Sequence, residues 1–404
     1  MSMNETPSGE RKHIAFFGCR NAGKSSLLNA VTGQNLAIVS DVLGTTTDPV
    51  YKSMELLPAG PVVVIDTPGL DDVGELGKMR IEKAVAVLRK TDLAILVTDA
   101  QKGFSNEDKE ILERIKERNI PAIIAVNKSD LNDVQTDEII QNEDKSSKII
   151  SISVSALTGE GIHELKETIA RLLNEDENDK VLVGDLVNEN DIVVLVVPID
   201  KAAPKGRLIL PQQQTIRDLL DHGAVPIVCR DSELKGVIDK YEKDIKLVIT
   251  DSQAFKKVSE IVPESIPLTS FSILFARYKG ELSHQFEGIN AVKNLKDGDK
   301  VLIAEGCTHH RQCGDIGTQK IPAMLAQKAN VNIDFTQGTE YPDDLSSYKV
   351  IIHCGGCMLN EKEMKARIEL AKRAGVPITN YGMTIACMTG VLERSMAPLI
   401  SKHN

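Results

Sequence analysis

A buried strand that runs directly into a glycine-rich loop and a helix is the feature that most constrains the fold. Residues 12–18, KHIAFFG, form an apolar run, and residues 18–25, GCRNAGKS, match the pattern GxxxxGK[ST] ahead of the helical pattern SLLNAVTG. Glycines at both ends let the backbone fold around a phosphate with its N–H groups pointing inward, and the helix dipole adds to that field. Lys24 is then expected to bridge the outer phosphates and Ser25 to bind Mg²⁺. For this motif alone, a simple turn before a helix is the alternative.

Two further apolar strands end in motifs that select the nucleotide. Residues 62–69, VVVIDTPG, end in DxxG, where Asp66 is expected to hold Mg²⁺ through water and the Gly69 N–H to meet the γ-phosphate. Residues 122–130, AIIAVNKSD, end in NKxD. The Asp130 carboxylate can accept two hydrogen bonds from guanine, whereas adenine offers no such donor pair and would leave it unpaired. The sequence therefore predicts GTP rather than ATP.

Two more segments complete the predicted nucleotide site. Residues 149–157, IISISVSAL, supply a last strand and a backbone contact to the base edge. Residues 44–48, GTTTD, lie where a switch segment carries a Mg²⁺-binding threonine; we expect Thr46, with Thr45 as the alternative. Five motifs in this order predict an α/β P-loop GTPase domain over residues 1–175. The residues expected to bind nucleotide are Gly18, Asn21, Ala22, Gly23, Lys24, Ser25, Ser26, Thr45, Thr46, Asp66, Gly69, Asn127, Lys128, Asp130, Ser155, Ala156 and Leu157, and those expected to serve hydrolysis are Lys24, Ser25, Thr46, Asp66 and Gly69.

The order and spelling of these motifs resemble the translation-factor-like GTPases that include the Era and MnmE groups, over about residues 12–175. The residue after Gly69 is Leu70, which cannot orient an attacking water as the glutamine at that place in Ras-like GTPases does, so we expect slow intrinsic hydrolysis. Asn21 resembles the asparagine that helps MnmE-like GTPases hold K⁺ where an arginine finger would act. The resemblance implies K⁺-stimulated hydrolysis; the alternative is an asparagine chosen for a tight turn.

Length, charge and cysteine content bound the rest of the chain. A chain of 404 residues is expected to form more than one domain, and no apolar run reaches the roughly 18 residues that span a bilayer. The polar start lacks the apolar segment of a secretory signal, which indicates a cytoplasmic protein whose seven cysteines bind metal rather than form disulfides. The formal charge of −10 counts against nucleic acid as the main partner. We expect neither nucleic acid nor membrane binding.

The middle of the chain reads as a small α/β domain over residues 176–265. Its start follows the charge run NEDENDK at residues 174–180, which is typical of a linker. Apolar segments such as residues 192–196, IVVLV, and 245–250, IKLVIT, alternate with helical patterns, so a parallel sheet is predicted. The segment holds no catalytic constellation. It is therefore a candidate for dimerisation, and a homodimer is expected.

Two cysteine–histidine clusters follow buried strands in the last part of the chain, residues 266–404. The segment VLIAEG at 301–306 precedes the first cluster, and the segment VII at 350–352 precedes HCGGC at 353–357. Because the carboxyl ends of parallel strands meet at one edge of a sheet, we expect both clusters to lie close together. The candidate metal ligands are Cys307, His309, His353, Cys354 and Cys357.

Three thiolates and two imidazoles offer five ligands for four positions. A tetrahedral Cys₃His zinc site and an iron–sulfur cluster are about equally compatible with this chemistry, and a group of buried thiols without metal is the remaining alternative. Cys313 is a further candidate ligand, whereas Cys19, Cys229 and Cys387 are expected to be structural.

The arrangement CxH…HCxxC behind a GTPase domain closely resembles the [FeFe]-hydrogenase maturation GTPases, the HydF family, over essentially the whole chain. The spellings CTHHRQCGDIG at residues 307–317 and NYGMTIA at 380–386 support this. The resemblance implies the domain order GTPase, dimerisation, cluster binding, and a [4Fe–4S] cluster on Cys307, Cys354 and Cys357 with an exchangeable fourth ligand. His353 is slightly favoured for that position over His309 or a carboxylate such as Asp315.

The same resemblance implies a role for the chain. It would be a GTP-hydrolysing scaffold and carrier for the di-iron precursor of the hydrogenase active site. Two radical-SAM partner enzymes make that precursor, and the apo-[FeFe]-hydrogenase receives it. The competing interpretation is a ribosome- or tRNA-associated Era/MnmE-like GTPase with a structural zinc domain. The acidic balance and the lack of a basic, aromatic-interleaved patch count against it.

Overall fold

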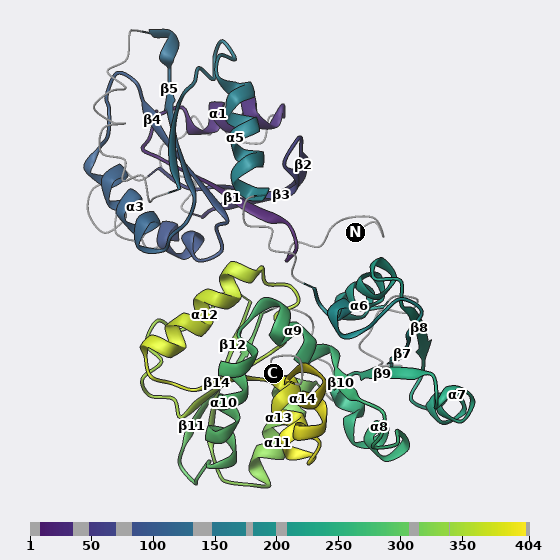
Figure 1. The fold of residues 1–404 in the computed structure, drawn as a ribbon. Coiled ribbons are helices and arrows are strands. Elements are labelled where there is room, and N and C mark those ends of the chain that lie inside the picture. The colour runs from purple at the N-terminus through teal and green to yellow at the C-terminus, as the bar shows by residue number, and fades with distance from the viewer. Residues whose placement is uncertain are drawn as a thin grey trace. The chain divides into compact units, whose positions relative to one another are not determined.

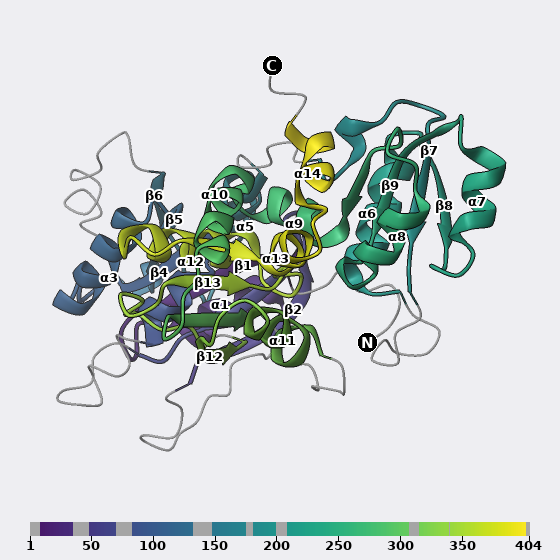
Figure 2. The ribbon, with the colours of Figure 1, turned by 90° about the horizontal axis from the view of Figure 1, so that it is seen from below.

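Three sheets of apolar, mostly parallel strands organise the chain. The computed structural model describes residues 9–34, 48–69, 83–131, 148–174, 181–198, 208–306, 315–338 and 340–400. It divides into two compact units, residues 1–178 and 179–404, and both are drawn as ribbons in Figures 1 and 2. The expectation of an α/β fold that begins with a P-loop domain is confirmed.

The first unit is built on a six-stranded sheet. The strand order is β2-β3-β1-β4-β5-β6, and every neighbouring pair is parallel except β2 with β3. The strands are β1 (Lys12–Phe17), β2 (Val50–Leu56), β3 (Gly60–Asp66), β4 (Leu93–Asp99), β5 (Ala122–Asn127) and β6 (Ile149–Ser153), and the named helices are α1 (Lys24–Thr32), α3 (Asn106–Glu117), α5 (Ile162–Asn174) and the short 3₁₀ turn η1 (Ser129–Leu131).

Helices cover both faces of this sheet, which explains why its central strands are apolar throughout rather than alternating. One core cluster joins the sheet to residues of α1 and α5, such as Leu27 and Leu165. The other joins the opposite face to α3 through Ile111 and Ile115 and to the helical residues 83–88. Figure 1 shows α3 on one side of the sheet and α1 with α5 on the other.

The second unit contains two four-stranded parallel sheets. The first has the order β10-β9-β7-β8 and the second the order β12-β11-β13-β14. Their strands are β7 (Ile192–Val196), β8 (Val225–Cys229), β9 (Ile245–Thr250), β10 (Leu268–Ser270), β11 (Lys300–Glu305), β12 (Asn332–Gln337), β13 (Val350–His353) and β14 (Ile378–Asn380).

Helices alternate with these strands along the chain. They are η2 (Gly184–Leu186), α6 (Leu210–Asp221), α7 (Leu234–Tyr241), η3 (Ser252–Ala254), α8 (Phe255–Ile261), α9 (Phe271–Lys279), α10 (Leu282–Lys293), η4 (Ile316–Lys320), α11 (Ile321–Ala326), α12 (Glu361–Arg373), α13 (Tyr381–Met388) and α14 (Leu392–Ile400). Among the described residues, every helix falls short of the length or the apolar character that spanning a bilayer requires.

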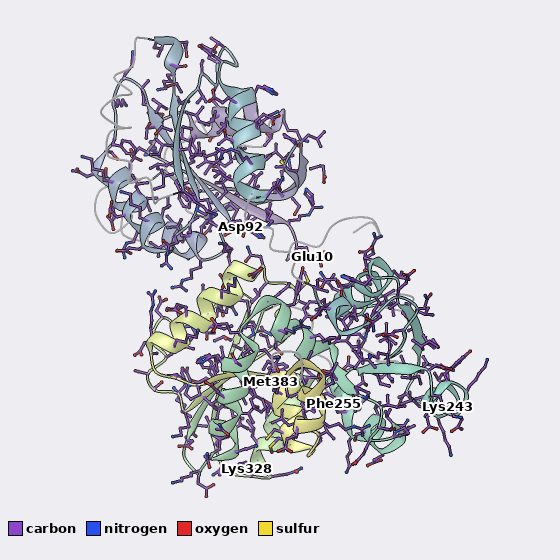
Figure 3. All side chains as sticks on the ribbon, in the orientation of Figure 1. Glu10, Asp92, Lys243, Phe255, Lys328 and Met383 are labelled. Atoms are coloured by element: carbon purple, nitrogen blue, oxygen red, sulfur yellow. The ribbon has the colours of Figure 1, made fainter. Side chains whose placement is uncertain are left out.

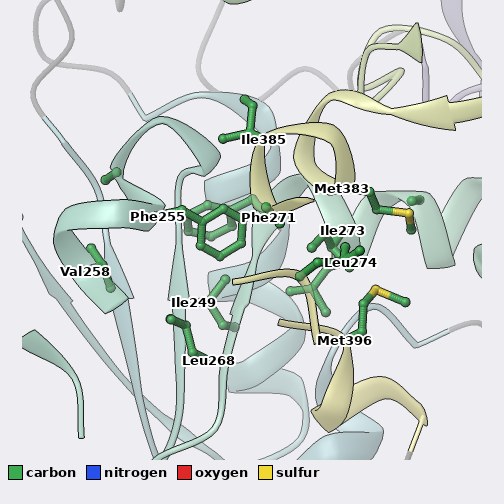
Figure 4. Packing of buried hydrophobic residues seen from close by; sticks show 14 of the residues in the cluster. Ile249, Phe255, Val258, Leu268, Phe271, Ile273, Leu274, Met383, Ile385 and Met396 are labelled. Carbon is green, nitrogen blue, oxygen red and sulfur yellow. The ribbon is translucent and has the colours of Figure 1, made fainter. Parts of the chain in front are cut away.

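One continuous apolar core joins the two sheets of the second unit. It extends from Leu182 to Leu399 and includes Phe255 of α8 and Phe271 of α9 (Figure 4). The first sheet also continues to β10, which pairs with β9 and ends at Ser270, a few residues past the boundary expected at 265. The two C-terminal segments that the sequence separates therefore pack as one body.

The side chain of Phe255 tests this shared core. It is fully buried, as is Met383 on α13, whereas Lys243 projects into solvent (Figure 3). Because Phe255→Ala leaves a cavity where the two sheets meet, we expect it to lower the free energy of unfolding by about 3–5 kcal/mol. Urea titration followed by circular dichroism measures this. Lys243→Ala, on the exposed chain after α7, is the matched control, and a loss for Phe255→Ala no larger than for the control would contradict a shared core.

Candidate functional site

Two glycines let the loop after β1 approach its neighbours closely. Gly23 caps the N-terminus of α1 with φ +85°, and a Cβ there would lie 2.1 Å from Asn127 Nδ2. Gly18 has φ +144°, and a Cβ there would lie 2.3 Å from the carbonyl oxygen of Val97 on β4. Any larger residue at either position would therefore push the loop off the sheet edge.

The Lys24 ammonium is held at the start of α1 next to the end of β3. Lys24 is buried, its Nζ donates to the carbonyl oxygen of Thr67, and it lies 3.6 Å from Asp66 Oδ1. Thr67 is itself anchored to β1, since its Oγ1 donates to the Phe16 carbonyl oxygen at 2.7 Å. The loop lysine and the DxxG motif are thus in direct contact.

The surroundings of Asp66 suit a carboxylate that binds a cation. Burial raises its pKa, and the neighbouring charge and hydrogen bonding of Lys24 oppose that rise. Its Oδ1 atom is buried, and among the described residues its polar neighbour is Lys24 Nζ at 3.6 Å, beyond ordinary hydrogen-bond distance. A water molecule of a hydrated Mg²⁺ would satisfy this atom, so the residues present fit the metal that a nucleotide brings.

Asn127 ties the phosphate loop to the far edge of the sheet. Its Nδ2 donates to the Ala22 carbonyl oxygen at 3.0 Å, and its Oδ1 accepts from the Ala156 N–H at 3.0 Å. The side chain is almost fully buried, so both bonds are shielded from water. The Ala156 N–H therefore helps to place Asn127, and the contact of Ala156 with the base stays a prediction.

Lys128 fixes the other side of the loop. It adopts φ +67°, and its Nζ donates to the Asn21 carbonyl oxygen at 2.8 Å and to Asp99 Oδ2 at 2.6 Å. Burial acts to raise the pKa of Asp99, but hydrogen bonds from Lys128 and the Gln101 N–H, with the charges of Lys128 and Lys102, together lower that pKa. Asp99, at the end of β4, is not among the predicted site residues. Its place at the carboxyl end of a buried strand is the sequence feature that could have identified it.

Ser155 orients the acid expected to recognise guanine. Its Oγ donates to Asp130 Oδ1 at 2.6 Å and accepts from the Thr158 N–H at 3.1 Å. The aspartate is therefore held from behind by a fully buried hydroxyl. Leu157, in contrast, is largely exposed. Thr45, Thr46 and Leu70 lie outside the described residues.

Cys19 has a structural contact inside the phosphate loop. Its Sγ lies 3.1 Å from Ser105 Oγ and 3.6 Å from Asp108 Oδ1. Ser105 and Asp108 form the capping box of α3, so the thiol joins the loop to the N-terminus of that helix. The pattern S-x-x-D at residues 105–108 was the sequence signal for this cap.

Removing the Ser155 hydroxyl tests the base-binding end of this site. Ser155→Ala leaves Asp130 without its buried donor, so we expect GTP affinity to fall about tenfold, which is about 1.4 kcal/mol. Calorimetric titration with GTP measures this. Thr158→Ala keeps the backbone N–H and is the matched control. Equal affinities for Ser155→Ala and the unmodified protein would show that Asp130 needs no support.

A second constellation lies where β11 and β13 end side by side. Ala304 is paired with His353 in the parallel register, and the Cys354 N–H donates to the Ala304 carbonyl oxygen at 2.8 Å. The next residues of both strands, Gly306 and Cys354, meet at the same edge: the Gly306 N–H donates to Cys354 Sγ at 3.0 Å. The chain enters the first cysteine–histidine cluster from this point, although Cys307, His309 and Cys313 lie outside the described residues.

The two described cysteines of this edge have polar support. Cys354 Sγ also accepts from the Gly356 N–H at 3.4 Å. Its thiol is enclosed by protein although the residue as a whole is partly exposed, and burial raises its pKa to about 11. Burial likewise raises the pKa of Cys357, and the charge of Lys279 opposes this. N–H groups aimed at sulfur stabilise a thiolate, so this donor set fits a thiolate-bound metal or cluster.

His353, which the sequence slightly favours as the exchangeable iron ligand, does not have the geometry of such a ligand. The ring is fully buried, its Nδ1 lies 2.8 Å from the Cys354 carbonyl oxygen, and its Nε2 lies 3.0 Å from Arg367 Nη1. Both nitrogens are engaged within the protein, so in this structure the ring offers no free nitrogen to iron. Asp315 is engaged as well, since its Oδ2 accepts from both Thr318 N and Thr318 Oγ1 at 2.8 Å. Within the described ranges, no three His, Cys, Asp or Glu side chains gather as a metal site would require.

Comparison with protein families gives three matches along the chain. A family described as a 50S ribosome-binding GTPase matches residues 13–128. The Hydrogen maturase F dimerization domain matches residues 182–280, and the Hydrogen maturase F tetramerization domain matches residues 283–398.

Individual relatives resemble only part of the chain. The tRNA modification GTPase MnmE of Lachnoclostridium phytofermentans is 34% identical over 208 residues, which are 50% of this chain and 44% of that protein. The protein of the same name from Clostridioides difficile is 35% identical over 179 residues, which are 44% and 36%. The chain thus spans less than half the length of these curated relatives. A solved structure of an Era variant from Aquifex aeolicus bound to GDP·AlF4⁻ is 23% identical, with a TM-score of 0.36, over 54% of this chain and 92% of that one.

Proposed function

The chain belongs to the hydrogen maturase F family, and from that premise we propose that it is a GTP-hydrolysing scaffold and carrier which assembles the di-iron subcluster precursor and delivers it to apo-[FeFe]-hydrogenase. The observation that carries the proposal is the order of the family matches: a P-loop GTPase is followed by the two maturase domains, the second of which contains the sulfur edge at β11 and β13. Two radical-SAM enzymes are its partners in making the precursor, and the cytoplasm is its location.

Each of the three proposed domains has its own role. Residues 1–175 bind GTP, residues 176–265 join two copies, and residues 266–404 hold the cluster. Nucleotide binding can act as a switch because Lys24 is already engaged with Thr67 and Asp66 in the DxxG segment. Phosphate oxygens compete for the same ammonium, so GTP changes the partners of the residues that lead into the segment after Gly69.

Hydrolysis depends on the residues around the phosphates. Lys24 would neutralise charge on the outer phosphates, while Ser25, Thr46 and Asp66 would hold Mg²⁺ directly or through water. Gly69 provides its N–H to the γ-phosphate. Because Leu70 has no group that can orient water, the reaction is slow. A K⁺ ion held by Asn21 would add positive charge near the phosphates, where an arginine finger acts in other GTPases.

The sulfur edge is the place for a [4Fe–4S] cluster on Cys307, Cys354 and Cys357. The N–H donors of Gly306 and Gly356 support this, because they stabilise sulfur in its thiolate form. Three fixed thiolates leave one iron with a replaceable ligand, which is the chemistry the cluster would supply to an incoming di-iron complex. Because both ring nitrogens of His353 are engaged within the protein, His309 is the remaining histidine candidate for that position.

The edge of the first sheet in the second unit supports self-association. β8 is a terminal strand of that sheet, and its Val225 and Val228 are 45% and 46% exposed; Leu220 at the end of α6 is 56% exposed. An edge strand with exposed apolar side chains is a ready surface for pairing with a second copy. A homodimer through β8 is consistent with the dimerization family match over residues 182–280.

The competing function is a ribosome- or tRNA-associated GTPase with a structural zinc domain. The likeness to MnmE and to the ribosome-binding GTPase family favours it, but that likeness lies in the GTPase part. Anaerobic purification separates the two functions: iron and sulfide with brown colour support the maturation role, whereas colourless protein with stoichiometric zinc supports the alternative.

Lys24→Ala tests whether the nucleotide switch and the cluster serve one function. Loss of the ammonium removes phosphate binding, so we expect GTP hydrolysis and activation of purified apo-hydrogenase to fall at least a hundredfold, while the cluster absorption is retained. Lys235→Ala, an exposed lysine of α7, is the matched control. A Lys24→Ala protein that binds no nucleotide yet activates the hydrogenase normally would refute the coupling.

Asn21→Gly tests the potassium site. Asn21 adopts φ +60°, a conformation that glycine also accepts, so this variant removes the side chain without straining the loop. We expect the unmodified protein to hydrolyse GTP several-fold faster in K⁺ than in Na⁺ at equal ionic strength, and Asn21→Gly to hydrolyse it at the Na⁺ rate in both salts. Phosphate release measures both rates. Equal rates of the unmodified protein in the two salts would exclude a potassium site.

A further inference from the structure

The turn formed by residues 354–359 directs its carbonyl groups toward buried basic side chains. Lys279, at the C-terminal end of α9, is almost fully buried. Its Nζ donates to the carbonyl oxygens of Gly356 at 3.3 Å, Cys357 at 3.1 Å and Leu359 at 2.8 Å. One ammonium therefore gathers three carbonyls of the same short turn, which is the largest number of hydrogen bonds that a lysine can donate.

The carbonyl of Cys354 is held by a second buried cation, acting through His353. A guanidinium can only donate, so the 3.0 Å contact between Arg367 Nη1 and His353 Nε2 requires that Nε2 be unprotonated. The proton then lies on Nδ1, which donates to the Cys354 carbonyl oxygen at 2.8 Å. The directions of these two hydrogen bonds therefore assign to His353 the neutral tautomer with its proton on Nδ1.

Arg367 is itself locked in place. It is 1% exposed, and its Nε donates to Glu363 Oε1 at 3.0 Å on the same helix, α12. Its Nη2 donates to the Gly338 carbonyl oxygen at 2.6 Å, and its guanidinium carbon lies 4.9 Å from the centre of the Tyr341 ring. With three contacts besides His353, the guanidinium cannot turn away from the imidazole without losing buried hydrogen bonds.

The same turn also donates a hydrogen bond to sulfur. With these carbonyls turned inward, the Gly356 N–H faces Cys354 Sγ, and Gly356 can take this course because it adopts φ +63°. Together with the Gly306 N–H from the neighbouring strand, the turn gives Cys354 Sγ two N–H donors, while its carbonyls accept hydrogen bonds from buried side chains.

Resting on the proposed function, we propose that Lys279 and the Arg367–His353 pair are positioning residues for the iron–sulfur site: they hold the HCGGC turn with its N–H groups toward sulfur. Because Glu363 compensates the charge of Arg367, it is the charge of Lys279 that raises the reduction potential of the cluster bound there. His353 then acts on the backbone of Cys354 and is not an iron ligand. A reduced cluster carries one more negative charge than an oxidised one, so a nearby buried cation stabilises the reduced form more.

Lys279→Met provides the first test. The protein is reconstituted anaerobically with iron and sulfide, and the cluster is titrated potentiometrically while its electron paramagnetic resonance spectrum is recorded. We expect Lys279→Met to shift the midpoint potential to a more negative value, and Lys279→Arg, which keeps the charge, to restore it in part. Lys256→Met, an exposed lysine of α8, is the control for a change of one unit of charge. A Lys279→Met cluster with the potential and spectrum of the unmodified protein would overturn the proposal.

His353→Asn and His353→Ala provide a second test that holds even where Lys279→Met does not fold. An asparagine amide places a donor close to the position of Nδ1, so a positioning role predicts that His353→Asn keeps the spectrum of the unmodified cluster while His353→Ala changes it. If His353 were an iron ligand, both substitutions would alter the spectrum equally, and that result would overturn the proposal. Absence of any iron–sulfur absorption in the reconstituted unmodified protein would instead reject the proposed function, and this inference with it.

Discussion

The parallel pairing of buried strands is the constraint on which both functional regions depend. In a parallel sheet every strand delivers its following loop to the same edge, so segments distant in the chain meet without any long connection between them. In the first unit this brings the loop after β1 to Asn127 at the end of β5. In the second unit it brings Gly306 after β11 to Cys354 after β13. A shift of one residue in either register would move these side chains to the other face of the sheet.

Buried cations recur at both edges, and each is compensated by backbone carbonyls. Lys24 contacts the Thr67 carbonyl as well as the Asp66 carboxylate, and Lys279 contacts three carbonyls of one turn. A buried ammonium is costly unless its donors are used, so these contacts confine the loops that supply the carbonyls. The two lysines differ in their expected response to a ligand: phosphate competes for Lys24, whereas Lys279 donates to three backbone carbonyls of the turn.

The second unit shows why an apolar core can matter to a site that lies at its surface. The sheet matched by the dimerization family and the sheet that carries the cysteines share one continuous core, to which α8, α9 and α13 contribute. α9 begins at Phe271 in this core and ends at Lys279 beneath the HCGGC turn. A packing change between the two sheets would therefore reach the sulfur edge through one rigid helix of nine residues.

The sequence by itself determined the P-loop GTPase domain, the preference for guanine and the strands that carry each motif, because these depend on local patterns: GxxxxGK[ST], DxxG and NKxD each follow an apolar strand. It also predicted that the strands before the two cysteine clusters end at one sheet edge, since parallel topology follows from alternating strands and helices, and β11 and β13 do pair in parallel. What it could not determine was the partner of a polar side chain. Spacing made His353 a ligand candidate, but Arg367, fourteen residues away, occupies its second nitrogen. Lys279, 77 residues before Gly356, carried no motif at all. Only the tertiary structure decides such contacts, because a buried polar side chain can bond only to groups on the elements that pack against it.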